Sequence, residues 1–253
     1  MTVSLPDPLK GLLQPGAYPH AVNGVELVTT HISWVLLAGE YAYKIKRPVR
    51  YPFVDLTSLE RRRFLCEEEL RLNRRFAPDI YIGICKIVAA SGAPKVLALD
   101  AVSAVESGPN AEVVLEYAVR MRRFPQTDEL DRLLDARRIE PHELETFGHR
   151  LAQMHARLPA APANSPWGSP EAVRNQLVRN LFECADAAAV FGWSREILAL
   201  HDTLQVRLAA AASTMAERRT SGRIRECHGD LHCRNIARVG GRLVPFDCLE
   251  YEP

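Results

Sequence analysis

The chain has 253 residues, of which 47% are hydrophobic and 25% are charged, and its formal net charge is +1. This composition is ordinary for a globular protein with a substantial core, and it excludes the strongly basic balance of many nucleic-acid-binding proteins. The sequence contains no apolar stretch near the roughly 20 residues of a membrane span, and its N-terminus lacks the apolar core of a signal peptide. We therefore expect a cytoplasmic protein that binds neither nucleic acid nor membrane.

The first half of the sequence is expected to form a small antiparallel sheet with one helix. Residues 1–24, with prolines at 6, 8, 15 and 19, are expected to be an irregular lead-in. Short β-rich runs follow at 25–29, 34–37 and 41–45, and further strands are expected at 80–89, 96–99 and 113–118. Between these two groups, Thr57-Ser58-Leu59-Glu60 forms a capping-box pattern that predicts a helix to about Phe76. We assign residues 1–116 to a first, β-rich lobe.

The second half is expected to be mainly helical. Helices are predicted near Thr127, near Pro141, and at about 170–190 and 195–218, with a proline-rich loop at 159–170. Thr220-Ser221-Gly222 is expected to end the last helix and to be followed by a strand. Residues 117–253 therefore form a second lobe, and the fold class is α+β with two lobes.

Three residues near the C-terminus have a spacing that suits phosphoryl transfer. Asp230 is followed five residues later by Asn235 and twelve residues further by Asp247. Gly240-Gly241, flanked by apolar runs, predicts a two-residue hairpin whose register places Asn235 opposite Phe246, with Asp247 one residue beyond. We expect Asn235 and Asp247 to share one magnesium ion and Asp230 to orient the acceptor hydroxyl as catalytic residue.

Cysteine and histidine residues around Asp230 leave one alternative open. The six cysteines lack the spacing of a disulfide framework, so reduced thiols are expected. Two thiols and two imidazoles suit zinc, so a zinc-dependent hydrolase is the alternative. The residues of that alternative are Cys227, His228, His232 and Cys233.

The segment from His228-Gly229-Asp230 to Asn235 reads H-G-D-x-x-x-x-N. It resembles the catalytic loop of the aminoglycoside phosphotransferase and choline-kinase branch of the protein-kinase-like fold. From about Thr30 onward, the chain also resembles the phosphotransferase-like half of bacterial proteins that are often joined to a P-loop ATPase. The Gly in place of the Arg of protein kinases implies that no phosphorylated activation loop acts as a switch.

The resemblance carries further expectations about fold and chemistry. It implies a two-lobed kinase-like fold, ATP and Mg²⁺ as cofactors, a small-molecule hydroxyl acceptor, and a fused or partner P-loop ATPase. It also implies further helices after Asp247, so the chain is expected to be truncated at its C-terminus. The expected function is an ATP- and Mg²⁺-dependent phosphotransferase; the alternative is a non-catalytic nucleotide-binding module that regulates an ATPase.

The third β-rich run resembles the strand that carries the phosphate-binding lysine of kinases. In Tyr41-Ala42-Tyr43-Lys44, strand alternation puts Ala42 and Lys44 on one face, so Ala42 is expected to pack on adenine while Lys44 reaches the α/β-phosphates. Lys46 shares that face and is the alternative. Glu69 has mostly apolar neighbours on its predicted helix, so we expect it to face inward and pair with Lys44.

Two further cofactor-binding segments are expected. The first two strands are joined by Thr30-His31-Ile32-Ser33 and not by a glycine-rich loop. Backbone amides there, with the hydroxyl of Ser33 or Thr30, are expected to hold the phosphates. The segment 115–118 resembles an inter-lobe hinge, which implies that backbone groups near Glu116 and Ala118 bind the adenine edge.

Overall fold

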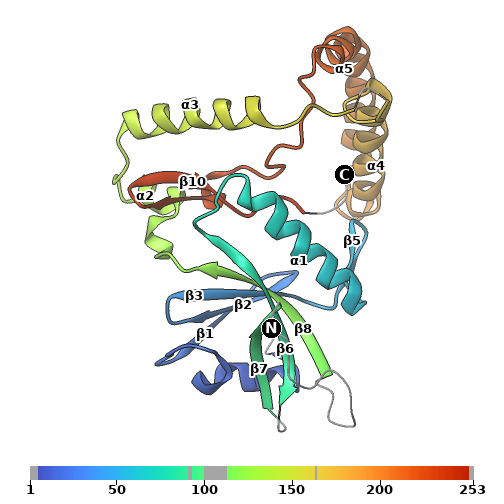
Figure 1. The fold of residues 1–253 in the computed structure, drawn as a ribbon. Helices are drawn as coiled ribbons and strands as arrows, with labels where there is room; N and C mark the ends of the chain where they lie inside the picture. Colours follow the sequence, from blue (N-terminus) through green and yellow to red (C-terminus); the bar gives the residue numbers. More distant parts are fainter. Residues whose placement is uncertain (1–4, 91–92, 100–112, 163, 251–253) are drawn as a thin grey trace. The chain divides into compact units, whose positions relative to one another are not determined.

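The computed structural model describes residues 5–90, 93–99, 113–162 and 164–250 (Figure 1). Its fold class is α+β, as expected. Two compact units are present: residues 1–150 together with 228–253, and residues 151–227. The expected boundary after residue 116 is therefore replaced by these limits, because residues 116 and 117 lie inside one strand. In the described ranges, every helix is too short or too polar to cross a lipid bilayer.

The first unit is built on a six-stranded antiparallel sheet with the order β1-β2-β3-β8-β6-β7. Its strands are β1 Val25–Thr29, β2 Ser33–Ala38, β3 Tyr41–Lys46, β6 Tyr81–Ala90, β7 Ala93–Ala98 and β8 Val113–Arg122. A separate short hairpin, β4 Arg50–Tyr51 with β5 Val54–Asp55, was not predicted. Strand β8 continues four residues beyond its expected end at residue 118. The connecting segment after it therefore begins at residue 123.

The N-terminal segment covers one face of the sheet, so the expected irregular lead-in is wrong for the part from residue 5 onward. Two short 3-10 helices, η1 Leu9–Leu13 and η2 Pro15–Ala17, form there (Figure 1, dark blue). They belong to one buried cluster with the sheet residues of that face. The cluster includes Leu5, Leu9, Leu12, Ala17, Tyr18, Trp34, Leu36, Tyr43 and Ile45. The apolar side chains of the segment fold it back because they bury the apolar face of the sheet.

Helix α1, Leu59–Arg74, packs against β6 and β8. Its N-cap is Ser58, whose hydroxyl accepts a hydrogen bond from the Arg61 amide at 3.1 Å. The Thr57 hydroxyl donates to Asp55 instead, so the predicted capping box does not form. The buried side of the helix carries Glu69, which is fully buried.

The C-terminal hairpin has the predicted register. Strands β9 Ile236–Val239 and β10 Arg242–Pro245 pair with Val239 opposite Arg242 and Ile236 opposite Pro245. The Phe246 amide then donates to the Asn235 carbonyl at 2.9 Å, which confirms that these two residues are neighbours. Helix α2 Leu130–Asp135 packs on the hairpin through a buried cluster with Ile236 and Leu243. Helix α3 Pro141–Arg157 starts in this unit and ends in the second one.

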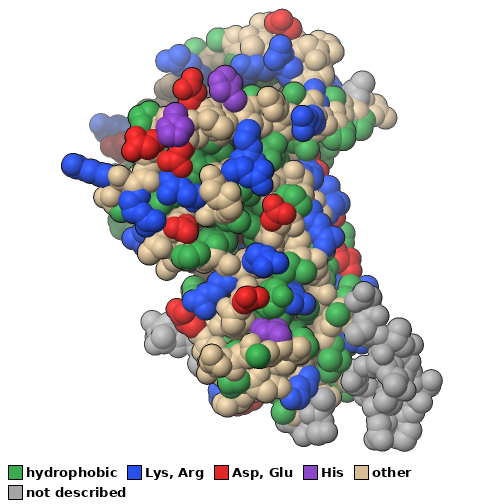
Figure 2. All heavy atoms as spheres, turned by 60° about the vertical axis from the view of Figure 1, so that its left-hand side comes forward, with side chains coloured by type: hydrophobic (Ala, Val, Ile, Leu, Met, Phe, Trp, Pro, Cys, Tyr) green, Lys and Arg blue, Asp and Glu red, His purple; other side chains and the backbone are tan. Residues whose placement is uncertain are grey.

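The second unit contains two long helices that pack together, α4 Pro170–Val190 and α5 Ser194–Thr220. Both agree with the predicted ranges, and α5 ends at the predicted Thr220-Ser221-Gly222 break. After that break, the expected strand is reduced to a single bridge between Arg225 and Ala160. On the face seen in Figure 2, basic and acidic side chains are interspersed. This face therefore carries no large patch of one charge.

Candidate functional site

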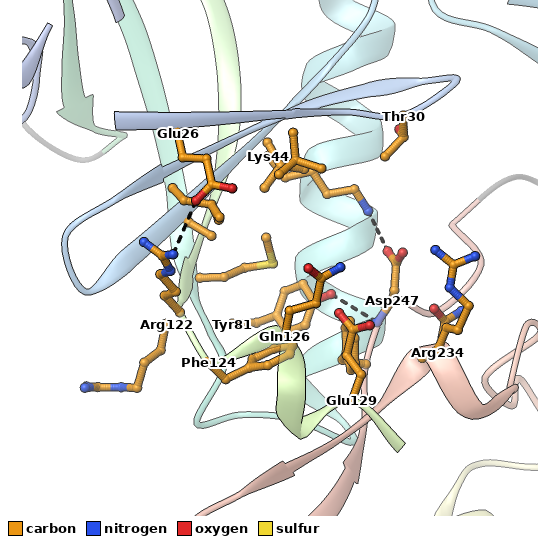
Figure 3. A pocket seen from close by; sticks show the side chains of 18 of the residues that line it. Glu26, Thr30, Lys44, Tyr81, Arg122, Phe124, Gln126, Glu129, Arg234 and Asp247 are labelled. Atoms are coloured by element: carbon orange, nitrogen blue, oxygen red, sulfur yellow. Dashed lines mark hydrogen bonds and ion pairs between the residues drawn. The ribbon is translucent and has the colours of Figure 1, made fainter. Parts of the chain in front are cut away.

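A pocket of about 950 Å³ lies within the first unit (Figure 3). Strands β1, β2, β3 and β8 supply an apolar wall, which includes Val28, Val35, Leu37, Ala42 and Met121. Phe124 and Phe246 extend that wall. The polar lining includes Thr30, His31, Lys44, Gln126, Glu129, Asp230, His232, Arg234, Asn235 and Asp247. Concave sites of about 300–1,000 Å³ with an apolar wall and a few convergent polar groups are typical of small-molecule binding.

Lys44 lies at the centre of the polar end. In the antiparallel ladder it is opposite Val35, and Ala42 is opposite Leu37, so all four side chains share the pocket face. The Lys44 ammonium is 2.9 Å from Glu69 Oε1 and 2.5 Å from Asp247 Oδ1. Figure 3 shows Lys44 and Asp247 pointing toward each other. The predicted Lys44–Glu69 pair is therefore present in the structure.

The Lys44–Asp247 contact keeps both partners charged. Burial lowers the pKa of Lys44, but Asp247 and Glu69 raise it more, so the net pKa lies well above 10.5. Burial raises the pKa of Asp247, but the Lys44 ammonium outweighs it and the net pKa is below 3.8. At neutral pH the pocket thus contains a carboxylate and an ammonium in direct contact.

Lys46, the alternative phosphate lysine, is fully buried and does not line the pocket. Its ammonium contacts Glu69 Oε2 at 2.5 Å and also Glu250 Oε1. Strand alternation correctly put both lysines on one face, and the structure places only Lys44 in the pocket. The contact of Glu250 with Lys46 was not predicted from the sequence. The one available signal was the position of Glu250, three residues after Asp247.

The backbone around Asp247 is held by three distant groups. Asp247 has a positive φ of 62°, a conformation that Asp tolerates better than most residues. Its amide donates to the Tyr81 hydroxyl at 3.1 Å, and the Cys248 amide donates to Asn73 Oδ1 at 2.9 Å. The Leu249 amide donates to the His228 carbonyl at 2.9 Å. Tyr81 and Asn73 could not be found from sequence, because their partners are more than 160 residues away.

His228 fixes the start of the 228–235 loop. Its buried ring bonds the Phe246 carbonyl through Nε2 at 2.8 Å, and its Nδ1 accepts from the Asp230 amide at 3.4 Å. A carbonyl can only accept, so Nε2 carries the proton and Nδ1 does not. Burial lowers the pKa of His228 below 6.5, which agrees with a neutral ring. Both ring nitrogens of His228 are engaged in these hydrogen bonds, so His228 is not available as a ligand of the zinc site considered above.

Gly229 is required by the same contacts. Its φ is 83°, and an added Cβ would lie 2.8 Å from Leu249 Cβ. Side chains essentially never come this close, and the left-handed region is unfavourable for residues with a Cβ. A residue with a side chain at position 229 is therefore excluded by the way Leu249 packs on the 228–235 loop.

Asp230 and Asn235 meet in the pocket. The Asp230 side chain is 54% exposed, and its Oδ2 lies 3.7 Å from His232 Nε2. Asn235 Nδ2 donates to the Asp230 carbonyl at 2.9 Å and to Asp230 Oδ2 at 3.3 Å. Because the amide nitrogen is turned to Asp230, the Asn235 oxygen is the atom that remains for a cation.

The pocket residues fit magnesium better than zinc. Asn235 and the partly exposed Asp247 offer oxygen atoms, and magnesium binds through few protein oxygens with phosphate oxygens and water. Within the described part of the chain, no group of three or more His, Cys, Asp or Glu side chains is placed to hold a metal ion. Cys227, His232 and Cys233 therefore do not form the zinc site of the alternative.

The turn between β1 and β2 corrects the expectation for Ser33. Ser33 is fully buried, does not line the pocket, and its hydroxyl has no hydrogen bond among the described residues. Arg47 instead holds the turn: its guanidinium donates to the Thr30 and His31 carbonyls at 2.7 and 3.0 Å, and its amide donates to the Ile32 carbonyl at 2.7 Å. Inside the turn, the Thr30 amide donates to the Ser33 carbonyl at 2.9 Å, and the Thr30 hydroxyl accepts from the Ser33 amide at 2.9 Å, so these groups are already engaged with one another.

Glu116 and Ala118 are also corrected. Both lie in the middle of β8, where Ala118 pairs with Ile45 and Cys85. The buried Glu116 carboxylate pairs with Arg62 at 2.6 and 3.0 Å, away from the pocket lining. Because β8 is longer than predicted, the pocket is lined by the last two residues of β8 and the two that follow it, residues 121–124.

No family model and no solved structure matches this chain. The chain is similar to an uncharacterized protein of Mycobacterium bovis and to an uncharacterized protein of Mycobacterium tuberculosis, with 28% identity over 228 residues in each case. The matched region covers 90% of this chain and 42% of each relative. The chain thus spans less than half the length of these relatives, whose names state no activity.

Proposed function

We propose that this chain is the kinase-like phosphotransferase suggested by its catalytic-loop pattern, which transfers the γ-phosphate of ATP to a hydroxyl of a small molecule. One observation carries the proposal: Lys44, Asp230, Asn235 and Asp247 line a single pocket although Lys44 and Asp247 are 203 residues apart. Thr30 and His31 of the β1–β2 turn also line this pocket. This set suits the positioning and charge stabilisation on which phosphoryl transfer depends.

The apolar wall suggests where a nucleobase binds. Ala42 is small and lies beside Val35, Leu37 and Met121, so a flat ring can pack against it. Lys44, two residues along the same strand, would then contact the phosphates. Asn235 and Asp247 would hold magnesium, which supplies charge neutralisation on the transferred phosphate when bound.

Asp230 is the proposed catalytic residue. Its half-exposed carboxylate accepts the proton of the acceptor hydroxyl as the new oxygen–phosphorus bond forms. The bond between the γ-phosphorus and the bridging oxygen breaks, and ADP leaves with that oxygen. The Asn235 amide, bonded to Asp230, keeps the carboxylate turned toward the pocket.

A nucleotide-binding module that regulates an ATPase is the competing proposal. A fused or partner ATPase is compatible with relatives that are more than twice as long as the matched region. A binding module would use Lys44 and Asp247, but it has no need of Asp230.

The decisive experiment measures Mg²⁺-ATP binding by calorimetry and then ADP formation with a panel of hydroxyl-bearing metabolites and aminoglycosides. The expected result is binding, together with ADP formation that requires one acceptor class and is lost in Asp230→Asn. Binding without acceptor-dependent ADP formation would favour the regulatory module. Absence of Mg²⁺-ATP binding at millimolar concentration would refute both proposals.

A further inference from the structure

A second lysine lies behind Lys44 and has no role in the proposed transfer. Lys46 is fully buried, and its ammonium contacts one oxygen of Glu69 and one oxygen of Glu250. Together with the contacts of Lys44, this gives one unbroken chain of alternating charges. Its order is Asp247, Lys44, Glu69, Lys46, Glu250.

Such a chain is a poor device for stability alone. Moving Lys46 and Glu250 out of water is unfavourable, and the attraction between them offsets this only in part. An apolar pair of similar volume would fill the same space. Stability alone therefore does not account for Lys46 and Glu250, and their contacts point to another role.

The contacts constrain the two groups that face the pocket. Lys46 donates a hydrogen bond to Glu69 Oε2, while Oε1 lies 2.9 Å from the Lys44 ammonium, so rotation of the carboxylate away from Lys44 would also break the Lys46 contact. Glu250 lies three residues after Asp247. Its contact with Lys46 therefore also anchors the polypeptide on the C-terminal side of Asp247. The amides of Cys248 and Leu249, bonded to Asn73 and His228, lie between these two anchors.

We propose that Lys46 and Glu250 are positioning residues for the nucleotide site: they lock Glu69 and the 247–250 segment so that Lys44 and Asp247 stay in register with the bound phosphates. This inference rests on the proposed function. It also means that the Lys44–Glu69 pair is held closed permanently, and is not formed on activation.

The paired substitution Lys46→Met/Glu250→Gln tests the proposal without changing net charge. The chain contains two positive and three negative groups, so removal of one group of each sign leaves the same excess of one negative charge. The matched control is Arg238→Met/Glu143→Gln, which removes an ion pair of 2.9 Å elsewhere in the same unit, away from the pocket lining.

We expect Lys46→Met/Glu250→Gln to bind Mg²⁺-ADP about 10- to 100-fold more weakly than the native chain, as is usual when groups that orient a metal ligand are removed. Calorimetry at a temperature well below each unfolding midpoint measures this. Hydrogen exchange of the Cys248 and Leu249 amides should also become faster, with or without nucleotide. The control variant should match the native chain in both measurements.

Equal Mg²⁺-ADP affinity in the native chain and the folded Lys46→Met/Glu250→Gln variant would overturn the inference, and so would unchanged amide exchange. If the double variant does not fold, Glu250→Gln alone, which leaves Lys46 paired with Glu69, should show both effects in smaller measure. Failure of the native chain itself to bind Mg²⁺-ADP would refute the proposed function, and is recognised before any variant is made.

Discussion

Replacing Gly229 with alanine tests the link between the 228–235 loop and the segment that carries Asp247. The backbone there has a φ of 83°, and the new Cβ would approach Leu249 Cβ to 2.8 Å. The left-handed conformation costs a residue with a Cβ about 1–2 kcal/mol. Leu249 Cβ is attached directly to the backbone and cannot swing away, so overpacking adds about 1–3 kcal/mol. We expect Gly229→Ala to lower the free energy of unfolding by about 2–5 kcal/mol.

Gly240→Ala provides the matched control. Gly240 has a φ of 57°, and an added Cβ would meet no atom within 4 Å, so only the conformational part of the effect applies. Urea denaturation of both variants gives the difference, which should be about 1–3 kcal/mol. A Gly229→Ala variant no less stable than Gly240→Ala would show that Leu249 does not pack on the loop as described.

Three further predictions concern the pocket and its supports. Asp230→Asn is expected to lower turnover about 10²-fold or more with near-native Mg²⁺-ATP affinity, because it removes the proposed proton acceptor. Native turnover in this variant would exclude Asp230 from the mechanism. Arg47→Ala removes two hydrogen bonds to the β1–β2 turn. It should lower the free energy of unfolding by about 1 kcal/mol per bond and weaken Mg²⁺-ADP binding in calorimetry, and unchanged binding would argue against a phosphate role for the turn. His228 should make the protein less stable as pH falls below about 6.5, because the unfolded chain takes up a proton that the buried ring resists. His228→Gln should flatten this decline in urea denaturation at a series of pH values, and an equal slope in both proteins would contradict it.

Local patterns predicted the elements that position the site. The Gly240-Gly241 turn alone determined the β9–β10 register, because a two-residue hairpin leaves one pairing. Alternation along β3 correctly put Ala42, Lys44 and Lys46 on one face. It could not choose between the two lysines, because both satisfy the same period of two.

The remaining features depend on contacts across the whole chain. Lys46 is buried because Glu69 of α1 and Glu250 near the C-terminus meet it, and no local window contains these three residues. The hinge expectation at Glu116 and Ala118 was wrong because β8 is extended by its pairing with both β3 and β6. The N-terminal segment takes its structure from the sheet face that it covers. Its own sequence has no regular hydrophobic period, so local patterns could not predict this structure.

The packing of that segment bears on how short a working version of this protein can be. A polypeptide that began at Val25 would keep every strand of the sheet and every pocket residue. It would also expose the side chains of Trp34, Leu36, Tyr43 and Ile45, which the first residues now shield from water. A contiguous apolar sheet face of this kind favours self-association, so the opening residues act as a built-in solubility cover for the sheet.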